Sequence, residues 1–430
     1  MELKRVVVTG LGAITPLGND VDTTWQAALR GESGAGPITH FDASKFKTQF
    51  ACEVKNFNSE EHFDRKKLRQ LDLYAQYALV AARQAVADAN LAPAAADGDD
   101  SNCGVNRNRV GVIVAAGIGG LHTFEEEAGY YAVHGEEMGP KFNPFFIPKM
   151  IADIASGHIS MEYGFHGPNY GTVSACASSN HAIIDAYNLI RLGKADAIVT
   201  GGAEAAIFPA GVGGFNSMHA LSTRNDDPTA ASRPFSASRD GFVMGEGSAV
   251  LVLEEMEHAL ARGAKIYAEI AGGGMSADAH HLTATHPEGL GAMLSMQNAL
   301  EDAEMKPEDI DYINTHGTST PVGDVSEIKA ICGVFGDHAS KLNISSTKSM
   351  TGHLLGATGA LEAIFSIKAV QNDIVPPTIN HVDDDVDPNI PTTLNLTFNK
   401  AQQRTVNAAL SNVFGFGGHN ATIIVKKFKA

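Results

Sequence analysis

One cysteine and two distant histidines give this chain its clearest chemical signal. Cys176 follows the β-compatible segment 170–173 and precedes small and apolar residues at helical spacing. The pattern predicts a thiol at a strand-to-helix junction, in the first turn of the helix, where free N–H groups and the positive dipole end favour a thiolate. The alternative is a cysteine that only packs as a small hydrophobe. The neighbouring alanines and serines leave room for a substrate beside the sulfur.

The two histidines lie in glycine-containing turns. His316 occurs in Asn314-Thr315-His316-Gly317, and His353 follows Gly352 just before an apolar helical pattern. A thiolate with two imidazoles is suited to acyl transfer. Neutral ring N–H groups can stabilise the enolate that forms when a carboxylated thioester loses carbon dioxide. Histidines that only cap or pack a turn are the alternative interpretation.

Two charged residues lie on either side of His353 in the sequence. Lys348 and Glu362 would orient this histidine if they formed a buried pair. An exposed ion pair would contribute little to stability. The sequence leaves both interpretations open.

A glycine-rich segment near the C-terminus, Gly415-Phe416-Gly417-Gly418, lacks the lysine and hydroxyl residue of a phosphate loop and precedes a strand. We expect a mobile gate, because glycine frees the backbone and Phe416 supplies an apolar plug. A second segment holds a basic cluster, Arg65, Lys66, Lys67 and Arg69. Three of its positions share a helical face, which is either solvated or a dock for an acidic partner.

Short apolar runs alternate with helical patterns along the chain, which predicts an α/β fold built from βαβ units. A strand, a turn with a reactive side chain and an apolar helix follow one another at 170–190 and again at 343–368. This echo suggests a duplicated unit. We expect an N-terminal half, 1–262, with the nucleophilic cysteine, and a C-terminal half, 263–430, with both histidines and the gate segment.

Composition narrows the function classes. The chain has 430 residues, 44% of them hydrophobic, and a net charge of −17, which makes nucleic acid an unsuitable partner. Its apolar runs are interrupted, so no membrane span is expected, and the first residues are typical of a strand, not a signal peptide. Four scattered cysteines without a CxxC pair predict neither disulfides nor a metal site, and they fit a reducing cytoplasm.

The motifs together resemble those of elongating β-ketoacyl-[acyl-carrier-protein] synthases of the thiolase superfamily, with the greatest similarity to type II. Their order and spacing match over nearly the whole chain. The matching segments include Ser174-Ala175-Cys176-Ala177, Gly201-Gly202-Ala203-Glu204, Arg239-Asp240-Gly241-Phe242, His316-Gly317-Thr318-Ser319-Thr320-Pro321, Lys348-Ser349-Met350-Thr351-Gly352-His353 and Gly415-Phe416-Gly417-Gly418.

The resemblance implies a thiolase-like fold, two similar α/β halves in a five-layer α-β-α-β-α arrangement, assembled as a homodimer. It implies that Cys176 accepts an acyl chain from acyl carrier protein and that His316 and His353 promote decarboxylation of the malonyl-carrier protein. The acyl chain then grows by two carbons in fatty acid biosynthesis. No cofactor is implied, because the phosphopantetheine arm arrives on the carrier protein.

The resemblance also assigns roles to the surrounding residues. Lys348 and Glu362 would support the catalytic groups, and the N–H groups of Cys176 and Phe416 would form an oxyanion hole. Gly415 and Gly417 would flank the gate. The expected substrate-binding residues are Ile118, Phe215, Phe242, Thr318 and Thr320, and the expected carrier-protein dock is Arg65, Lys66, Lys67 and Arg69.

Several related activities compete with this interpretation. A degradative thiolase needs a second cysteine near the C-terminus, an initiating synthase uses Cys-His-Asn, and a chain-length factor lacks the nucleophile; none fits this chain. A ketosynthase of a dedicated polyketide or aryl-polyene pathway remains the alternative, as does a carrier-binding subunit without turnover. The chain departs from the family pattern at 178–180, Gln70, His219 and His419. The departures at Gln70 and His219 concern carrier recognition, and the one at His419 concerns loop motion.

Overall fold

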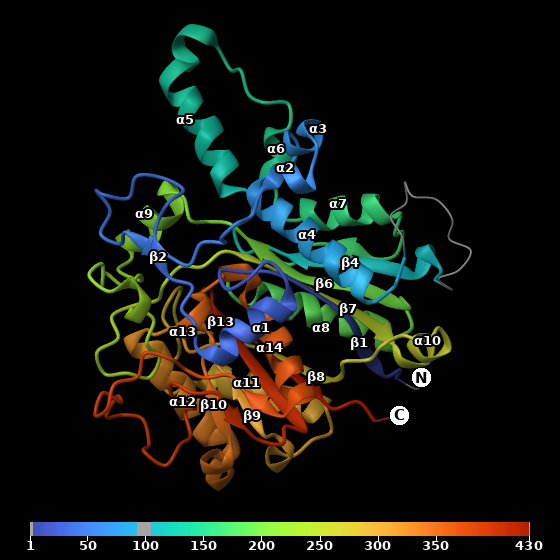
Figure 1. The fold of residues 1–430 in the computed structure, drawn as a ribbon, viewed down its shortest axis with the longest axis vertical. Helices are drawn as coiled ribbons and strands as arrows, with labels where there is room; N and C mark the ends of the chain where they lie inside the picture. The colour runs from blue at the N-terminus through green and yellow to red at the C-terminus, as the bar shows by residue number, and fades with distance from the viewer. Residues whose placement is uncertain (1–2, 93–104, 430) are drawn as a thin grey trace.

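The computed structural model describes residues 3–92 and 105–429. Its core is a ten-stranded sheet in the order β10-β9-β13-β14-β8-β1-β7-β6-β4-β5 (Figure 1). The strands of this sheet are β1 (Val6–Ile14), β4 (Val110–Ala115), β5 (Asn169–Tyr170), β6 (Ala197–Glu204), β7 (Gly247–Glu255), β8 (Ala268–Ala277), β9 (Tyr312–Asn314), β10 (Asn343–Ser345), β13 (Ala408–Gly415) and β14 (His419–Lys426). Two short ribbons, β2 (Gly36–Pro37) with β3 (Phe50–Ala51) and β11 (Ile374–Val375) with β12 (Gln402–Gln403), lie outside it.

The sheet repeats one topology in its two halves. Numbered along the chain within each half, the strands lie in the order 3-2-4-5-1, as β5-β4-β6-β7-β1 and as β10-β9-β13-β14-β8. The directions repeat too: strands 3, 2 and 4 are parallel, while strand 5 runs antiparallel to both of its neighbours. This repetition supports the expected division near residue 262, which stays a prediction.

Helices form three layers around the two halves of the sheet. The helices are α1 (Val21–Arg30), α2 (Ser59–His62), α3 (Arg65–Leu68), α4 (Leu73–Asp88), α5 (Leu121–Met138), α6 (Phe146–Met150), α7 (Ile154–Tyr163), α8 (Ser178–Arg191), α9 (Pro209–Ser217), α10 (Met256–Ala261), α11 (Leu290–Asp302), α12 (Pro321–Phe335), α13 (Lys348–Thr351) and α14 (Thr358–Asn372). α4 and α7 cover the N-terminal half, α11 packs on the C-terminal half beside α12, and α8 and α14 contact each other and strands of both halves. The result is the expected α-β-α-β-α order (Figure 1).

Burial explains why the sequence forms these layers. All nine residues of β1 and of β7 are buried, because helices cover both faces of the sheet. α14 is buried on nearly all sides, and its buried residues include Leu361, Phe365 and Ile367. This is expected of a helix that lies between the two halves of the sheet. α8 buries Ile183, Ala186 and Ile190 in the same central layer.

Two features differ from the sequence expectation. The strand before Cys176 is only Asn169–Tyr170, and residues 171–173 belong to no strand. The two halves also join edge to edge, because Val6, Val7 and Val8 of β1 pair with Ile270, Glu269 and Ala268 of β8. Local periodicity carries no signal for this junction, since it joins strands more than 250 residues apart.

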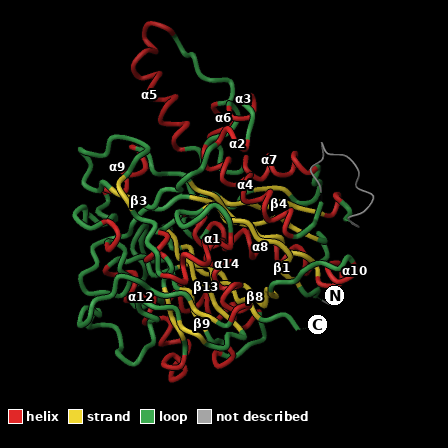
Figure 2. The backbone as a smooth tube through the Cα atoms, viewed as in Figure 1, coloured by secondary structure: helices red, strands yellow, loops and turns green. Residues whose placement is uncertain are grey.

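The elements that carry the predicted chemistry meet at one end of the sheet. Cys176 precedes α8, His316 follows β9, His353 follows α13, and the gate segment joins β13 to β14. α5 and the loop after it extend away from the rest of the molecule (Figure 1, Figure 2).

Candidate active site

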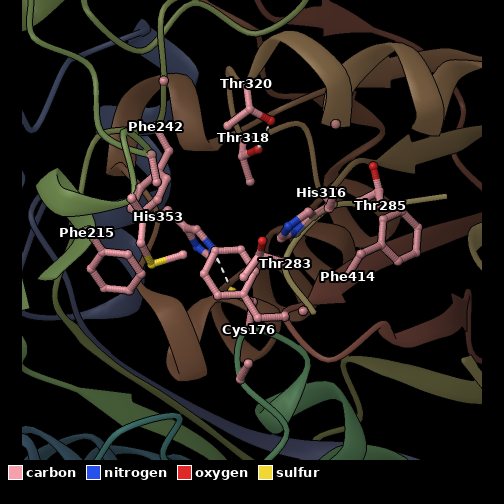
Figure 3. A pocket seen from close by; sticks show the side chains of 18 of the residues that line it. Cys176, Phe215, Phe242, Thr283, Thr285, His316, Thr318, Thr320, His353 and Phe414 are labelled. Atoms are coloured by element: carbon pink, nitrogen blue, oxygen red, sulfur yellow. Dashed lines mark hydrogen bonds between the residues drawn. The ribbon is translucent and has the colours of Figure 1, made fainter. Parts of the chain in front are cut away.

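A cavity of about 540 Å³ brings the three predicted reactive side chains together. Cys176, His316 and His353 line it, and both rings turn their nitrogens toward the space beside the sulfur (Figure 3). The side chains come from three segments that are far apart in the sequence. The cavity wall is mostly apolar, so charge that develops inside it is poorly screened by solvent.

The turn at Cys176 is held by a short hydrogen-bond network. Ala175 has a positive φ of 52°, so the chain bends sharply before the cysteine. Ser178 Oγ donates to Ala175 O at 2.6 Å and accepts from Ser174 N at 2.8 Å. α8 begins at Ser178, so Cys176 lies just before the helix and not in its first turn as predicted.

The expected thiolate is not the favoured form of Cys176 in the free protein. Burial raises the pKa of the thiol to about 12, and the positive charge of Lys348 only partly opposes this effect. The thiolate expected from the helix end is therefore not favoured, because α8 begins only after Cys176 and desolvation of the sulfur is the largest influence on its pKa. Nucleophilic attack by this sulfur would therefore require loss of the thiol proton.

His353 contacts Cys176, the predicted nucleophile, directly. Its Nε2 lies 3.0 Å from Cys176 Sγ, and its Nδ1 lies 3.2 Å from Thr358 Oγ1. Leu354 N–H already donates to this threonine oxygen at 3.0 Å, so the hydroxyl proton is available for Nδ1. That arrangement leaves the ring proton on Nε2, facing the sulfur and the cavity. Burial, and then the charge of Lys348, hold the pKa of His353 well below its usual range, so the ring is neutral.

His316 is held through its backbone. Glu327 accepts from His316 N at 2.9 Å and from Gly317 N at 2.8 Å, while Asn412 donates to the same carboxylate at 3.2 Å. Burial and the charge of Lys348 lower the pKa of His316 well below its usual range. The His316 and His353 ring centroids are 5.3 Å apart and nearly perpendicular. Two neutral imidazoles thus face one reaction space.

Lys348 and Glu362 form a buried ion pair, which excludes the exposed alternative. Their side chains are 1% and 3% exposed, and Lys348 Nζ donates to Glu362 Oε1. Neither residue of the pair lines the cavity. Burial raises the pKa of Glu362 to about 7, against the opposing charge of Lys348. The ammonium acts on both histidines by its field, since it lowers both of their pKa values.

The glycine-rich segment is the turn of the hairpin between β13 and β14. Gly417 and Gly418 have φ values of 89° and 74°, which favour glycine. A side-chain carbon at Gly415 would lie 3.0 Å from Cys176 N, so this glycine lets the hairpin approach the nucleophile. Gly415 and Phe416 line the cavity, whereas Gly417 lies in the turn beyond it. His419 folds over Gly417, where an added carbon would meet its ring at 2.7 Å.

The predicted substrate-binding residues all line the cavity. They are Ile118 and four residues labelled in Figure 3, namely Phe215, Phe242, Thr318 and Thr320. Phe215 contacts Phe242 and lies 6.4 Å, centroid to centroid, from Phe416. Thr318 and Thr320 share a hydrogen bond of 2.9 Å between their hydroxyls. The aromatic and hydroxyl groups thus occupy different parts of the wall. His219, one of the departures noted above, also lines it.

The predicted basic dock lies away from the cavity wall. Arg65, Lys66 and Arg69 are exposed, as expected from their shared helical face. Lys67 instead turns inward, with Nζ 3.1 Å from His158 Nδ1. Burial lowers the pKa of Lys67. Burial and the charge of Lys67 lower the pKa of His158 to about 4. The surface available to a partner is therefore the three exposed residues.

Two family models match most of the chain. The model of the β-ketoacyl synthase N-terminal domain matches residues 3–259, and that of the C-terminal domain matches residues 267–382. The chain belongs to the β-ketoacyl synthase family. This membership confirms the resemblance seen in the motifs, the thiolase-like fold and the predicted class of acyl-transferring enzyme.

Similar proteins extend over the full length of this family member. The 3-oxoacyl-[acyl-carrier-protein] synthase 2 of Staphylococcus aureus strain N315 is 49% identical over 430 residues, which cover 99% of each chain. A β-ketoacyl synthase from Burkholderia phymatum has a TM-score of 0.89 at 37% identity, over 99% of this chain and 100% of that chain. A type II polyketide synthase acyl-carrier protein in complex with its ketosynthase bound to the hexaketide gives a TM-score of 0.88 at 33% identity, with the same coverage.

Sequence reasoning missed the buried acids that hold this family member's site in place. Glu327 looks like an ordinary helical acid, and only its tertiary contacts show that it accepts the His316 and Gly317 amides. The sequence position of Glu204 could have indicated a structural role, because a charged residue at the end of a buried strand needs hydrogen-bond or charge partners. Thr358, which orients His353, has no distinguishing pattern.

Two further results concern what the described residues lack. Within residues 3–92 and 105–429, no group of three His, Cys, Asp or Glu side chains is arranged to hold a metal ion. No helix in the same ranges is long and apolar enough to cross a membrane. Cys103 lies outside the described residues, while Cys52, Cys176 and Cys332 are free thiols.

Proposed function

We propose that this protein catalyses the decarboxylative Claisen condensation of malonyl-acyl carrier protein with an acyl chain held on Cys176. Each turnover extends the chain by two carbons in fatty acid biosynthesis. The observation that carries the proposal is the meeting of Cys176 with two neutral imidazoles in one apolar cavity beside a glycine hairpin. Full-length relatives named 3-oxoacyl-[acyl-carrier-protein] synthase 2 support it.

The first half-reaction is acyl transfer. Cys176 Sγ attacks the thioester carbonyl of an acyl-carrier protein, and its proton passes to the departing pantetheine sulfur as that carbon–sulfur bond breaks. The amides of Cys176 and Phe416 are the proposed donors to the oxyanion. Close packing of Gly415 against the Cys176 amide supports this arrangement, because it places the hairpin backbone beside the nucleophile.

The second half-reaction is decarboxylation and attack. Malonyl-carrier protein loses carbon dioxide, and the electron pair of the broken bond forms an enolate. The Nε2–H groups of neutral His353 and His316 are the proposed donors to its oxygen. The enolate carbon then attacks the acyl-cysteine carbonyl, the carbon–sulfur bond breaks, and the Cys176 thiolate recovers a proton. Lys348 and Glu362 support this step by fixing the field around both rings.

The proposed partner is an acyl carrier protein, whose phosphopantetheine arm enters past Thr318 and Thr320. Gly415 and Gly417 give the Phe416 gate its freedom, and Ile118, Phe215 and Phe242 contact the acyl chain. Arg65, Lys66 and Arg69 form the dock, and the solved complex of a related ketosynthase with its carrier supports such a partner. Lys67 is left out of the exposed dock because it contacts His158.

We propose a cytoplasmic homodimer. β5 is one of the two edge strands of the sheet, and its outer edge has no strand partner in the described chain. Exposed apolar side chains include Tyr170 of β5 itself and Phe124 and Val133 of α5. An open edge beside exposed apolar surface is suited to pairing with a second copy.

A ketosynthase of a dedicated polyketide or aryl-polyene pathway is the second candidate. Its support is the similarity to a polyketide ketosynthase at a TM-score of 0.88. The chemistry at Cys176 is the same in both cases, so the accepted acyl chain distinguishes them. A carrier-binding subunit without turnover would form no acyl-enzyme at all.

The deciding experiment is intact-mass analysis after mixing the protein with acyl-carrier proteins of increasing chain length. We expect an added acyl mass on Cys176 across a series of saturated chains. Cys176→Ala, which retains the fold, should show none. Acylation restricted to oxidised or polyene chains would favour the dedicated pathway. The absence of acylation of folded wild type by every carrier would overturn the proposal.

A further inference from the structure

Glu204, at the end of β6, is a buried carboxylate with an unusual set of partners. Its side chain is inaccessible to solvent, and all four of its hydrogen bonds come from backbone amides. Gly117 N and Gly356 N donate to Oε2 at 2.8 Å and 3.0 Å, while Ile118 N and Gly119 N donate to Oε1 at 3.1 Å each. No charged side chain is among these partners.

These amides belong to two turns that border the reaction cavity. Gly117, Ile118 and Gly119 form the turn after β4, and Ile118 lines the cavity. Gly356 lies three residues after His353, in the short 3-10 helix Leu355–Ala357. One carboxylate therefore binds two segments. One is the turn that carries Ile118, and the other is the short helix that follows His353, the residue in contact with Cys176.

Gly117 and Gly356 pack tightly around the Glu204 carboxylate, and Gly117 also packs against the turn before Cys176. A side-chain carbon at Gly117 would lie 2.7 Å from Glu204 Oε2 and 3.2 Å from Ala175 O. One at Gly356 would lie 2.1 Å from Gly117 N. Backbone from three turns therefore converges around the carboxylate, and only glycine at both positions permits the approach.

We infer that Glu204 is a positioning residue for acyl transfer. Its carboxylate holds the Ile118 wall and the turn after His353 against the turn of Cys176, and its negative charge restrains ionisation of the thiol. This inference rests on the proposed acyl transfer at Cys176. Glu204 touches neither the sulfur nor the substrate space, so its effect is transmitted through the backbone and through the field.

The charges around the thiol support the second part of the inference. After burial, the groups that act on the pKa of Cys176 are Lys348, which lowers it, and Glu204 and Glu362, which raise it. The neutral rings of His353 and His316 also face the thiol, and His219, Asp240 and Asp278 line the same cavity. Burial raises the pKa of Glu204 to about 7 against its four amide donors, so the carboxylate is charged above that pH.

The test compares three variants with wild type. Glu204→Gln removes the charge and turns an NH₂ group toward amides that are themselves donors. Glu204→Asp keeps the charge but withdraws it by one methylene. Glu254→Gln is the matched control. Glu254 is equally buried, on β7, and pairs with Ala197 at the opposite end of β6, on the order of 20 Å away along the strand.

Two readouts separate positioning from folding. The first is the rate of Cys176 acylation by long-chain and short-chain acyl-carrier proteins, followed by intact mass. The second is alkylation of Cys176 by iodoacetamide between pH 7.5 and 10, which needs no carrier. Thermal unfolding shows that each variant is folded.

We expect Glu204→Gln to lower long-chain acylation about tenfold while raising alkylation at pH 9, with the pH profile displaced to lower pH by up to about one unit. Glu204→Asp should lower acylation and keep the wild-type alkylation profile. Glu254→Gln should match wild type in both. A folded Glu204→Gln with unchanged acylation, or a fall in alkylation parallel to acylation, would overturn the inference. Failure of wild type to be acylated would overturn the proposed function instead.

Discussion

The buried pair of Lys348 and Glu362 leads to a prediction about stability. Removing one partner or the other should destabilise the protein with opposite pH dependence. Lys348→Met leaves a buried carboxylate, and Glu362→Leu leaves a buried ammonium. Removing one partner of such a pair typically costs about 3–5 kcal/mol, because the remaining charge loses its compensation. Each remaining group escapes part of this cost by becoming neutral, and the cost of neutralisation depends on pH.

The ordinary pKa values set a ceiling on each cost. At pH 7, neutralising a lysine costs about 4.6 kcal/mol and neutralising a glutamate about 3.7 kcal/mol. At pH 5.5 these values become about 6.7 and 1.6 kcal/mol. Acidification should therefore reduce the destabilisation of Lys348→Met by less than about 2 kcal/mol, because wild-type Glu362 also binds a proton below about pH 7. It should increase the destabilisation of Glu362→Leu by about 2 kcal/mol or more.

The assay is urea unfolding at pH 5.5 and 7.0, followed by circular dichroism. The double variant Lys348→Met/Glu362→Leu should be less destabilised than either single variant, because no charge remains to be compensated. Arg30→Met is the control, since the Arg30–Glu32 pair is more than half exposed and should be worth under about 1 kcal/mol. If both single variants respond to pH in the same direction, the two groups are not a buried charged pair and the reasoning fails.

Three further predictions concern the site and its partner. Cys176→Gln should decarboxylate malonyl-carrier protein faster than Cys176→Ala and condense nothing; equal rates of carbon dioxide release would contradict the role of the two histidines. Burial raises the pKa of Glu327 to about 7, so the folded chain holds a proton that the unfolded chain releases near its ordinary value. Stability from this group is present below that ordinary value and is lost as the pH rises through 7, by about 1.4 kcal/mol per pH unit at most. Glu327→Gln should flatten the fall of the melting temperature between pH 5 and 7, and an unchanged slope would refute this account. Arg65→Glu/Arg69→Glu should weaken carrier binding about tenfold at low salt and little at high salt, whereas Lys265→Glu, before β8, should not; salt-independent weakening would exclude an electrostatic dock.

The sequence was sufficient to select three distant side chains that line one cavity and to suggest a repeated α/β unit. Cys176, His316 and His353 each stand in a turn of small residues between apolar segments, and such local patterns survive folding. The two α/β halves follow from the repeated strand–turn–helix order, and the strand order now seen in both halves agrees with it. The cavity wall followed only from the resemblance, since nothing local distinguishes Ile118 or Phe215 from core residues.

The remaining features depend on tertiary contacts that local patterns do not encode. The inward turn of Lys67 depends on His158 of α7, more than 90 residues away. The raised pKa of Cys176 depends on how completely the surrounding turns desolvate it, which the helix-end argument does not include. Glu204 and Glu327 act through amides of distant glycines and His316, so their roles appear only when those turns are brought together.

The place of β1 in the sheet has a consequence for how the chain is made. β1 lies between β7 and β8, yet more than 230 residues separate its last residue, Ile14, from the first residue of β7, Gly247. At 5–20 residues per second, a ribosome needs roughly ten to fifty seconds to supply that partner. During this interval the apolar first strand has no sheet to enter, and the high contact order of the finished sheet slows its closure. Nascent chains of this protein should thus be clients of chaperones that shield an early, unpaired strand.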